Sequence, residues 1–121
     1  MTVVKPVLRR VHSPDVQSLE AFAPEKQNYF GILIQAMFGP EDGRGEESFD
    51  ILVCSPEWIK EKVDKEKIVV GRHYLLVDRF NLHDICNYIS TYADSCVGSN
   101  WREAATKLSR LGRWEFEDYQ S

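Results

Sequence analysis

The sequence predicts an α+β fold, in which an antiparallel or mixed β-sheet carries helices packed mainly on one face. Three observations indicate this class. Strand-like apolar segments form a hairpin pattern in the first half of the chain, segments of helical period follow mainly in the second half, and turn residues separate them. The expected order is β-α-β-β-α-β-α-α-β, within a single domain spanning residues 1–121.

The first expected strand covers residues 3–11, where Pro6 is typical of a strand start or a sheet edge. A short helix is expected to follow. Its N-terminal cap is Ser13, and Pro14 fits the first helical position because an amide there needs no partner within the helix. Pro24 is expected to end this helix.

The central pair of strands is the clearest pattern in the chain. Residues 28–38 are apolar on both alternating faces, which predicts a strand buried on at least one side. Residues 47–55 alternate, with Phe49, Ile51 and Val53 on one face. The Gly-rich turn "EDGRG" between the two segments predicts a β-hairpin.

A second cap-and-proline signal, Ser55 followed by Pro56, predicts a helix that runs to about Val63. The mixed charges of residues 57–67 are typical of a solvated helix surface with pairs four residues apart. Residues 73–80 are then expected to form a strand.

The last part of the chain predicts two more helices and a strand. Asn81 is expected to cap a longer helix, in which apolar residues recur at the helical period. Gly98 is expected to end this helix. The next helix covers residues 101–111, closed by Gly112 as its C-terminal cap. A final strand is expected over residues 113–119.

Charge and composition restrict the classes of partner. The formal net charge is -4 and the sequence pI about 5.4, which argues against a nucleic-acid ligand because such proteins usually carry a basic face. The N-terminus lacks an apolar segment of signal-peptide length, and no later run is long enough to span a membrane. We therefore expect a cytoplasmic protein that binds neither nucleic acid nor membrane.

The cysteines and histidines raise the question of an enzyme. Cys54, Cys86 and Cys96 are odd in number and widely spaced, so neither a disulfide framework nor a zinc site is indicated. Cys54 with His73 or His83 is a candidate nucleophile–base pair. Because Cys54 ends an apolar strand, a role as a small core residue is the preferred interpretation.

The acidic turn around "EDGRG" matches neither a metal site nor a phosphate site. Its carboxylates lack the alternating ligand spacing of a calcium loop, and the turn leads into a strand rather than into the helix that a phosphate loop needs. Glu115 and Glu117 lie two residues apart on a strand, and nothing builds a glycosidase cleft between them. No metal and no cofactor are expected.

The distribution of charge favours a protein partner. Residues 41–50 hold five acids and one base, residues 113–119 hold three acids and one base, and residues 101–113 hold four bases and one acid. Aromatic residues lie among the acids, as in the anchors and charged rim of a protein interface. A negative surface also accelerates encounter with a positive partner such as a nuclease.

Four blocks resemble one family. "GEESFDILVCSPEW" (45–58), "GRHYLLVD" (71–78), "CVGSNWREAATKL" (96–108) and "WEFEDY" (114–119) are similar, in this order, to immunity protein 8 of bacterial polymorphic toxin systems, which include contact-dependent growth inhibition. The resemblance runs nearly end to end. It implies a small cytosolic α+β protein without catalysis or cofactor, which binds the C-terminal domain of its cognate toxin and blocks it.

The resulting hypothesis is that this chain is an immunity protein, which neutralises its toxin by stoichiometric binding. The toxin is expected to be a nuclease. The alternatives are a regulatory binding module for another basic protein and a Cys/His-dependent enzyme. The oligomeric state and the choice between active-site occlusion and remote binding stay open. The candidate toxin-binding residues are Glu41, Asp42, Glu46, Glu47, Asp50, Glu115, Glu117, Asp118 and Tyr119.

Overall fold

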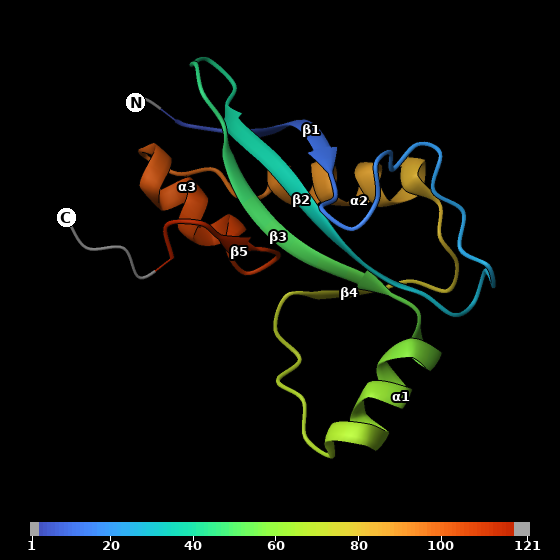
Figure 1. Cartoon of the computed structure of the whole chain (residues 1–121). Coiled ribbons are helices and arrows are strands. Elements are labelled where there is room, and N and C mark those ends of the chain that lie inside the picture. Colours follow the sequence, from blue (N-terminus) through green and yellow to red (C-terminus); the bar gives the residue numbers. More distant parts are fainter. Residues whose placement is uncertain (1–2, 118–121) are drawn as a thin grey trace.

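The structure is a computed structural model that describes residues 3–117 (Figure 1). Its elements, in chain order, are β1 (Pro6–His12), β2 (Gly31–Pro40), β3 (Glu47–Cys54), α1 (Pro56–Glu66), β4 (Tyr74–Leu76), α2 (Leu82–Asp94), α3 (Trp101–Leu108) and β5 (Arg113–Trp114). A mixed sheet with helices of this kind confirms the predicted α+β class.

The sheet has the strand order β1-β2-β3-β4, and β5 pairs with β3 as well. The first three strands are antiparallel, and the predicted hairpin of β2 and β3 is confirmed, with Ile34 opposite Ile51. β4 runs parallel to β3 beside residues 52–54, whereas β5 is antiparallel to β3 at Phe49 and Asp50. One edge of β3 is therefore shared by two short strands that come from distant parts of the sequence.

One hydrophobic core lies between the sheet and two helices, α2 and α3. Phe49, Ile51 and Val53 are buried on the side of β3 that faces this core, as their alternation predicts. Ile89 of α2 and Leu108 of α3 are fully buried against them. Figure 1 shows α2 behind β1 and β2, so the opposite face of these strands carries no helix. Burying each large aliphatic side chain contributes roughly 1.5–3 kcal/mol.

The predicted helix between Ser13 and Pro24 is wrong, because this segment consists of turns and bends. The Ser13 hydroxyl does accept a hydrogen bond from the Asp15 amide, at 3.1 Å. However, β1 ends opposite Gln35 of β2, and the Asp15 carboxylate accepts the Leu33 amide further along β2, at 3.0 Å. This tertiary contact outweighs the local helix signal.

The other boundaries differ by a few residues, most of all at the two short strands. The predicted strand 73–80 forms only over Tyr74–Leu76. Of the predicted strand 113–119, the described residues up to Glu117 form a strand only over Arg113–Trp114. After β5 the chain turns, with the Glu117 amide donating to the Trp114 carbonyl at 2.9 Å. Two candidate residues of that predicted strand, Asp118 and Tyr119, lie outside the described residues.

Candidate functional site

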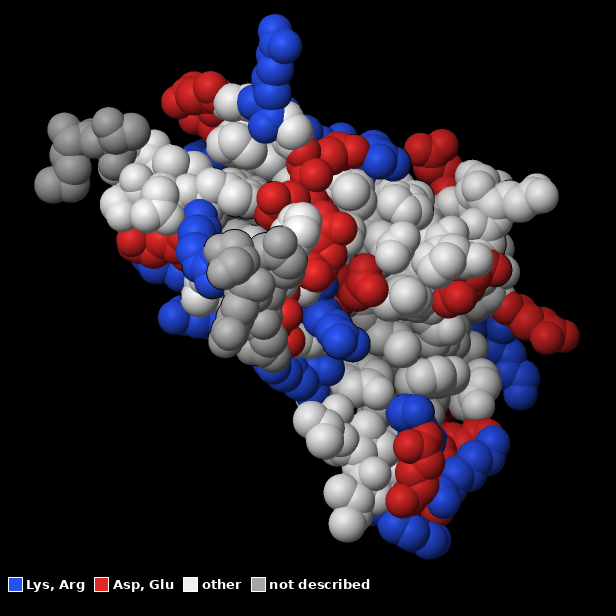
Figure 2. Space-filling view, turned by 60° about the vertical axis from the view of Figure 1, so that its left-hand side comes forward, with Lys and Arg blue, Asp and Glu red and all other residues white. Residues whose placement is uncertain are grey.

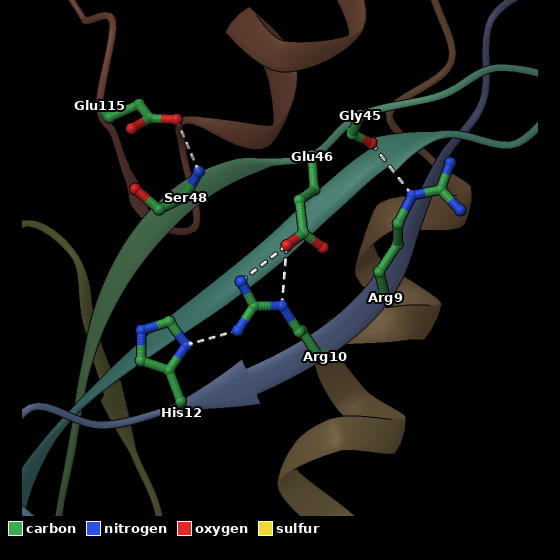
Figure 3. Close-up of polar contacts among 7 residues, drawn as sticks. All are labelled: Arg9, Arg10, His12, Gly45, Glu46, Ser48 and Glu115. Carbon is green, nitrogen blue, oxygen red and sulfur yellow. Dashed lines mark hydrogen bonds and ion pairs between the residues drawn. The ribbon is translucent and has the colours of Figure 1, made fainter.

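The acidic loop, residues 41–46, connects β2 to β3 and is held by an arginine of β1. The pairing of β1 with β2 shifts register between Leu8 and Arg10, which leaves Arg9 as the extra residue of a β-bulge. The Arg9 guanidinium donates to three backbone carbonyls, those of Pro40 at 2.6 Å, Gly43 at 2.9 Å and Gly45 at 3.1 Å (Figure 3 shows the contact with Gly45). The loop is therefore fixed by a planar group that bonds several carbonyls at once.

Gly39 allows this close arrangement. A Cβ atom at this position would lie 2.1 Å from the Gly45 carbonyl oxygen and 2.5 Å from Nε of Arg9. No other residue type leaves room for both the returning loop and the arginine.

Two carboxylates at the tip of the acidic loop are free. Glu41 and Asp42 are exposed, and neither side chain takes part in a hydrogen bond or ion pair among the described residues. The Glu41 backbone amide is bound to the Lys5 carbonyl at 2.8 Å, so the position of the residue is defined. These two charges thus project from a loop whose backbone is fixed.

Glu46 forms an ion pair with Arg10, unlike Glu41 and Asp42, which have no partner within the described residues. Its carboxylate lies 2.7 Å from Arg10, whose guanidinium is also 3.5 Å from Nδ1 of His12 (Figure 3). Much of the negative charge predicted at this position is therefore compensated within the protein.

Glu47 is part of the fold. One oxygen of its carboxylate, Oε1, accepts the indole N–H of Trp101 at 2.7 Å and that of Trp114 at 2.8 Å. These two hydrogen bonds therefore join the start of β3 to α3 and to β5. The sequence contains no local signal for this role, because the two indoles lie 54 and 67 residues away.

Asp50 is partly buried in the middle of β3, between Gln35 of β2 and Arg113 of β5. Its Oδ1 atom is buried and has no hydrogen-bond partner in the described part of the chain. A buried acceptor without a donor is unfavourable by about 1–3 kcal/mol.

The two glutamates after β5 also make contacts within the protein. Glu115 accepts the Ser48 amide at 3.1 Å, which extends the pairing of β5 with β3 (Figure 3). Glu117 forms an ion pair with Arg72 at 2.5 Å. The structure thus brings Glu115 beside Ser48 at the start of β3, although 67 positions separate these two residues in the sequence.

The resulting surface is acidic with arginines interspersed. Figure 2 shows acidic side chains in a band on one side of the molecule, with basic side chains around them. The candidate carboxylates are not equivalent. Some have no partner within the described residues, some are paired with an arginine, and others form hydrogen bonds that hold the fold together. Within residues 3–117, no group of three or more His, Cys, Asp or Glu is placed to hold a metal ion, and no helix is long and apolar enough to cross a membrane.

The candidate nucleophile is in an unfavourable environment. Cys54 is fully buried, and burial raises the pKa of its thiol to about 11, so the thiol stays protonated at neutral pH. The two candidate bases have other partners: Nε2 of His73 lies 2.7 Å from the Ser109 carbonyl, and His83 contacts Asn87 at 3.1 Å. These contacts support the structural interpretation of Cys54.

Comparison with known proteins gives one match. No curated protein and no solved structure matches this chain. The sequence profile of immunity protein 8 matches residues 6–119, which is nearly the whole chain and includes every described strand and helix. The chain therefore belongs to the immunity protein 8 family.

Proposed function

We propose that this chain is a cytoplasmic, non-enzymatic inhibitor that binds a cognate toxin domain in a stoichiometric complex. Its membership of the immunity protein 8 family supports a role as a toxin immunity protein. The observation that supports the mode of binding is the acidic loop, in which a clamped backbone presents the free carboxylates of Glu41 and Asp42.

A fixed loop favours tight binding, because little conformational entropy is lost when the partner binds. The free carboxylates attract a positive surface and accelerate association, particularly at low salt. Nucleases carry such positive surfaces because their substrate is a polyanion. We therefore propose a toxin domain with a basic face, and a nuclease is the class that best fits.

The candidate residues contribute differently in this proposal. Glu41 and Asp42 act in steering, and Asp50 contacts the toxin through the part of its side chain that is exposed on β3. Glu46, Glu115 and Glu117 contact the toxin at the rim, where their internal partners compensate part of their charge. Glu47 has a structural role. Asp118 and Tyr119 stay in the proposed surface on the strength of the sequence.

The first test is a growth assay in which this chain is co-expressed with the toxin domain encoded beside it. The wild-type chain should restore growth and should co-purify with the toxin in a stoichiometric complex. Restored growth without a stable complex would contradict inhibition by binding, and would favour an enzymatic or regulatory role.

The second test is a pair of charge reversals with a matched control. Replacing Glu41 and Asp42 together by Lys should slow association with the toxin about 10-fold at low salt, and less at high salt. The control replaces Glu20 and Glu25 by Lys, two exposed acids outside the acidic loop, and changes the net charge by the same amount. Equal association rates for the two double variants, measured by stopped flow, would exclude the acidic loop as the steering surface.

A further inference from the structure

The outer edge of β4 is unpaired. β4 ends the strand order of the sheet, and no strand of the described residues lies beyond it (Figure 1). The His73 carbonyl accepts from Leu52 and the Val77 amide donates to Cys54, both at 3.0 Å, so these alternate residues direct their backbone groups toward β3. The amides and carbonyls of Tyr74 and Leu76 consequently point to the open edge.

A groove runs beside this edge, between β4 and α2. It has a volume of about 620 Å³ and is lined by Leu75 and Leu76 of β4, by residues 77–79 and Asn81 of the following loop, and by Asp84, Ile85 and Tyr88 of α2. Leu76 is 54% exposed and Tyr88 56% exposed, and both belong to the few large apolar residues with so much exposed surface. An open strand edge beside a groove with exposed apolar side chains is the arrangement that receives an extended peptide.

The rim of the groove carries two acids and one base, Asp78, Asp84 and Arg79, and is therefore negative on balance. Asp78 is almost fully exposed and only loosely paired with Arg79, at 4.0 Å, and Asp84 is exposed in the first turn of α2. These charges favour a basic segment. They disfavour a second copy of this chain, because two such rims would repel each other.

We propose that an extended segment of the toxin adds to the outer edge of β4 as a further strand. The backbone groups of Tyr74 and Leu76 hydrogen-bond to this segment, an apolar side chain of the segment enters the groove, and basic side chains face Asp78 and Asp84. This contact rests on the proposed toxin-binding function and is separate from the acidic loop.

Hydrogen exchange of single amides tests the backbone contact. The amides of Tyr74 and Leu76 should exchange rapidly in the free protein and become protected at least 10-fold when the neighbouring toxin domain is bound. The Leu75 amide is the internal control. Like His73 and Val77, Leu75 directs its backbone groups toward β3, so its amide should be protected in both states. Unchanged exchange at Tyr74 and Leu76 in a formed complex would overturn the proposal.

A side-chain variant tests the same edge independently. Leu76→Lys leaves the backbone intact, places a positive charge where a basic segment should dock, and should weaken toxin binding at least 10-fold. The matched control is Val3→Lys, because Val3 is also 54% exposed and lies outside the sheet. The control should bind like the wild type.

The outcomes separate the two proposals. If the wild-type chain binds the toxin and the Leu76→Lys variant binds it equally well, the β4 contact is overturned and the immunity function is left intact. A wild-type chain that neither binds the toxin nor restores growth would overturn both. Dimers of the free chain that Leu76→Lys abolishes would show that a second copy occupies this edge, which also contradicts the proposal.

Discussion

Single polar side chains hold this fold together across long stretches of sequence. Arg9 bonds three carbonyls of the hairpin, Glu47 bonds two indoles, and the buried Ser55 hydroxyl accepts the amides of both Phe30 and Trp58. Each uses one group for several bonds, so each loss leaves more than one polar group unpaired. Substitution at these positions therefore has consequences beyond one contact.

Arg9→Gln should loosen the acidic loop. An amide cannot bond the three carbonyls at once, so the amides of residues 41–46 should exchange faster and the complex with the toxin should dissociate faster. The control is Arg44→Gln, which removes the same charge from an exposed arginine of the loop. Equal exchange rates in the two variants, measured by hydrogen–deuterium exchange, would show that Arg9 does not organise the loop.

Glu47→Ala should destabilise the protein by about 2–4 kcal/mol, because it leaves the indole N–H groups of Trp101 and Trp114 without their acceptor. Glu47→Gln keeps an acceptor oxygen and should cost less. Urea unfolding followed by tryptophan fluorescence measures both effects, with Glu41→Ala as the control at an exposed carboxylate. A midpoint for Glu47→Ala equal to that of the control would refute the role of this carboxylate.

At the scale of elements, α1 is the least attached part of the fold. It contains no buried residue, and its surface carries three ion pairs between residues four apart. It is fixed at its start, where Ser55 caps the helix and Trp58 packs over Gly31 of β2. The hydrogen bond of Tyr29 with Glu61, at 2.5 Å, adds one further attachment.

Gly31→Ala should release α1 without unfolding the sheet. The added Cβ would lie 2.3 Å from the Trp58 ring, so the indole and the start of α1 must move. Amide protection along α1 should fall, with a loss of global stability of about 1–3 kcal/mol. Gly71→Ala is the control, since a Cβ there meets nothing within 4 Å. Unchanged protection of α1 in Gly31→Ala would contradict this account of its attachment.

At the scale of the whole molecule, one core connects nearly all elements. Residues of β2, β3, α2, α3 and β5 belong to a single buried cluster, with no second core among the described residues. The sharing of β3 between β4 and β5 links the middle and the end of the chain to the hairpin. The molecule is therefore expected to fold as one cooperative unit, as the single predicted domain requires.

Thermal unfolding should show one transition, with equal calorimetric and van't Hoff enthalpies. Near-ultraviolet and far-ultraviolet circular dichroism should give the same midpoint, because secondary structure and core packing are lost together. Two separated transitions would show that the chain holds two independent units.

Local signals in the sequence were sufficient for the hairpin and the helix starts. The alternation of Phe49, Ile51 and Val53, the turn glycines, and the caps at Ser55 and Asn81 act within a few residues, so a sequence pattern contains them completely. A local signal of the same kind also predicts a helix after Ser13, but the deciding contact there is the hydrogen bond from the Leu33 amide of β2 to Asp15. A local signal cannot include a partner that folding brings in from elsewhere.

The candidate surface shows this limit most clearly. The sequence by itself determined the α+β class, the hairpin, the family and the excess of acids around residues 41–50 and 113–119. Only the tertiary structure decided which acids are free, since Glu46 meets Arg10, Glu47 meets two indoles, and Arg9 fixes the loop. The physical reason is that charge content is a property of composition, whereas compensation of a charge depends on donors that only the folded chain brings within hydrogen-bond distance.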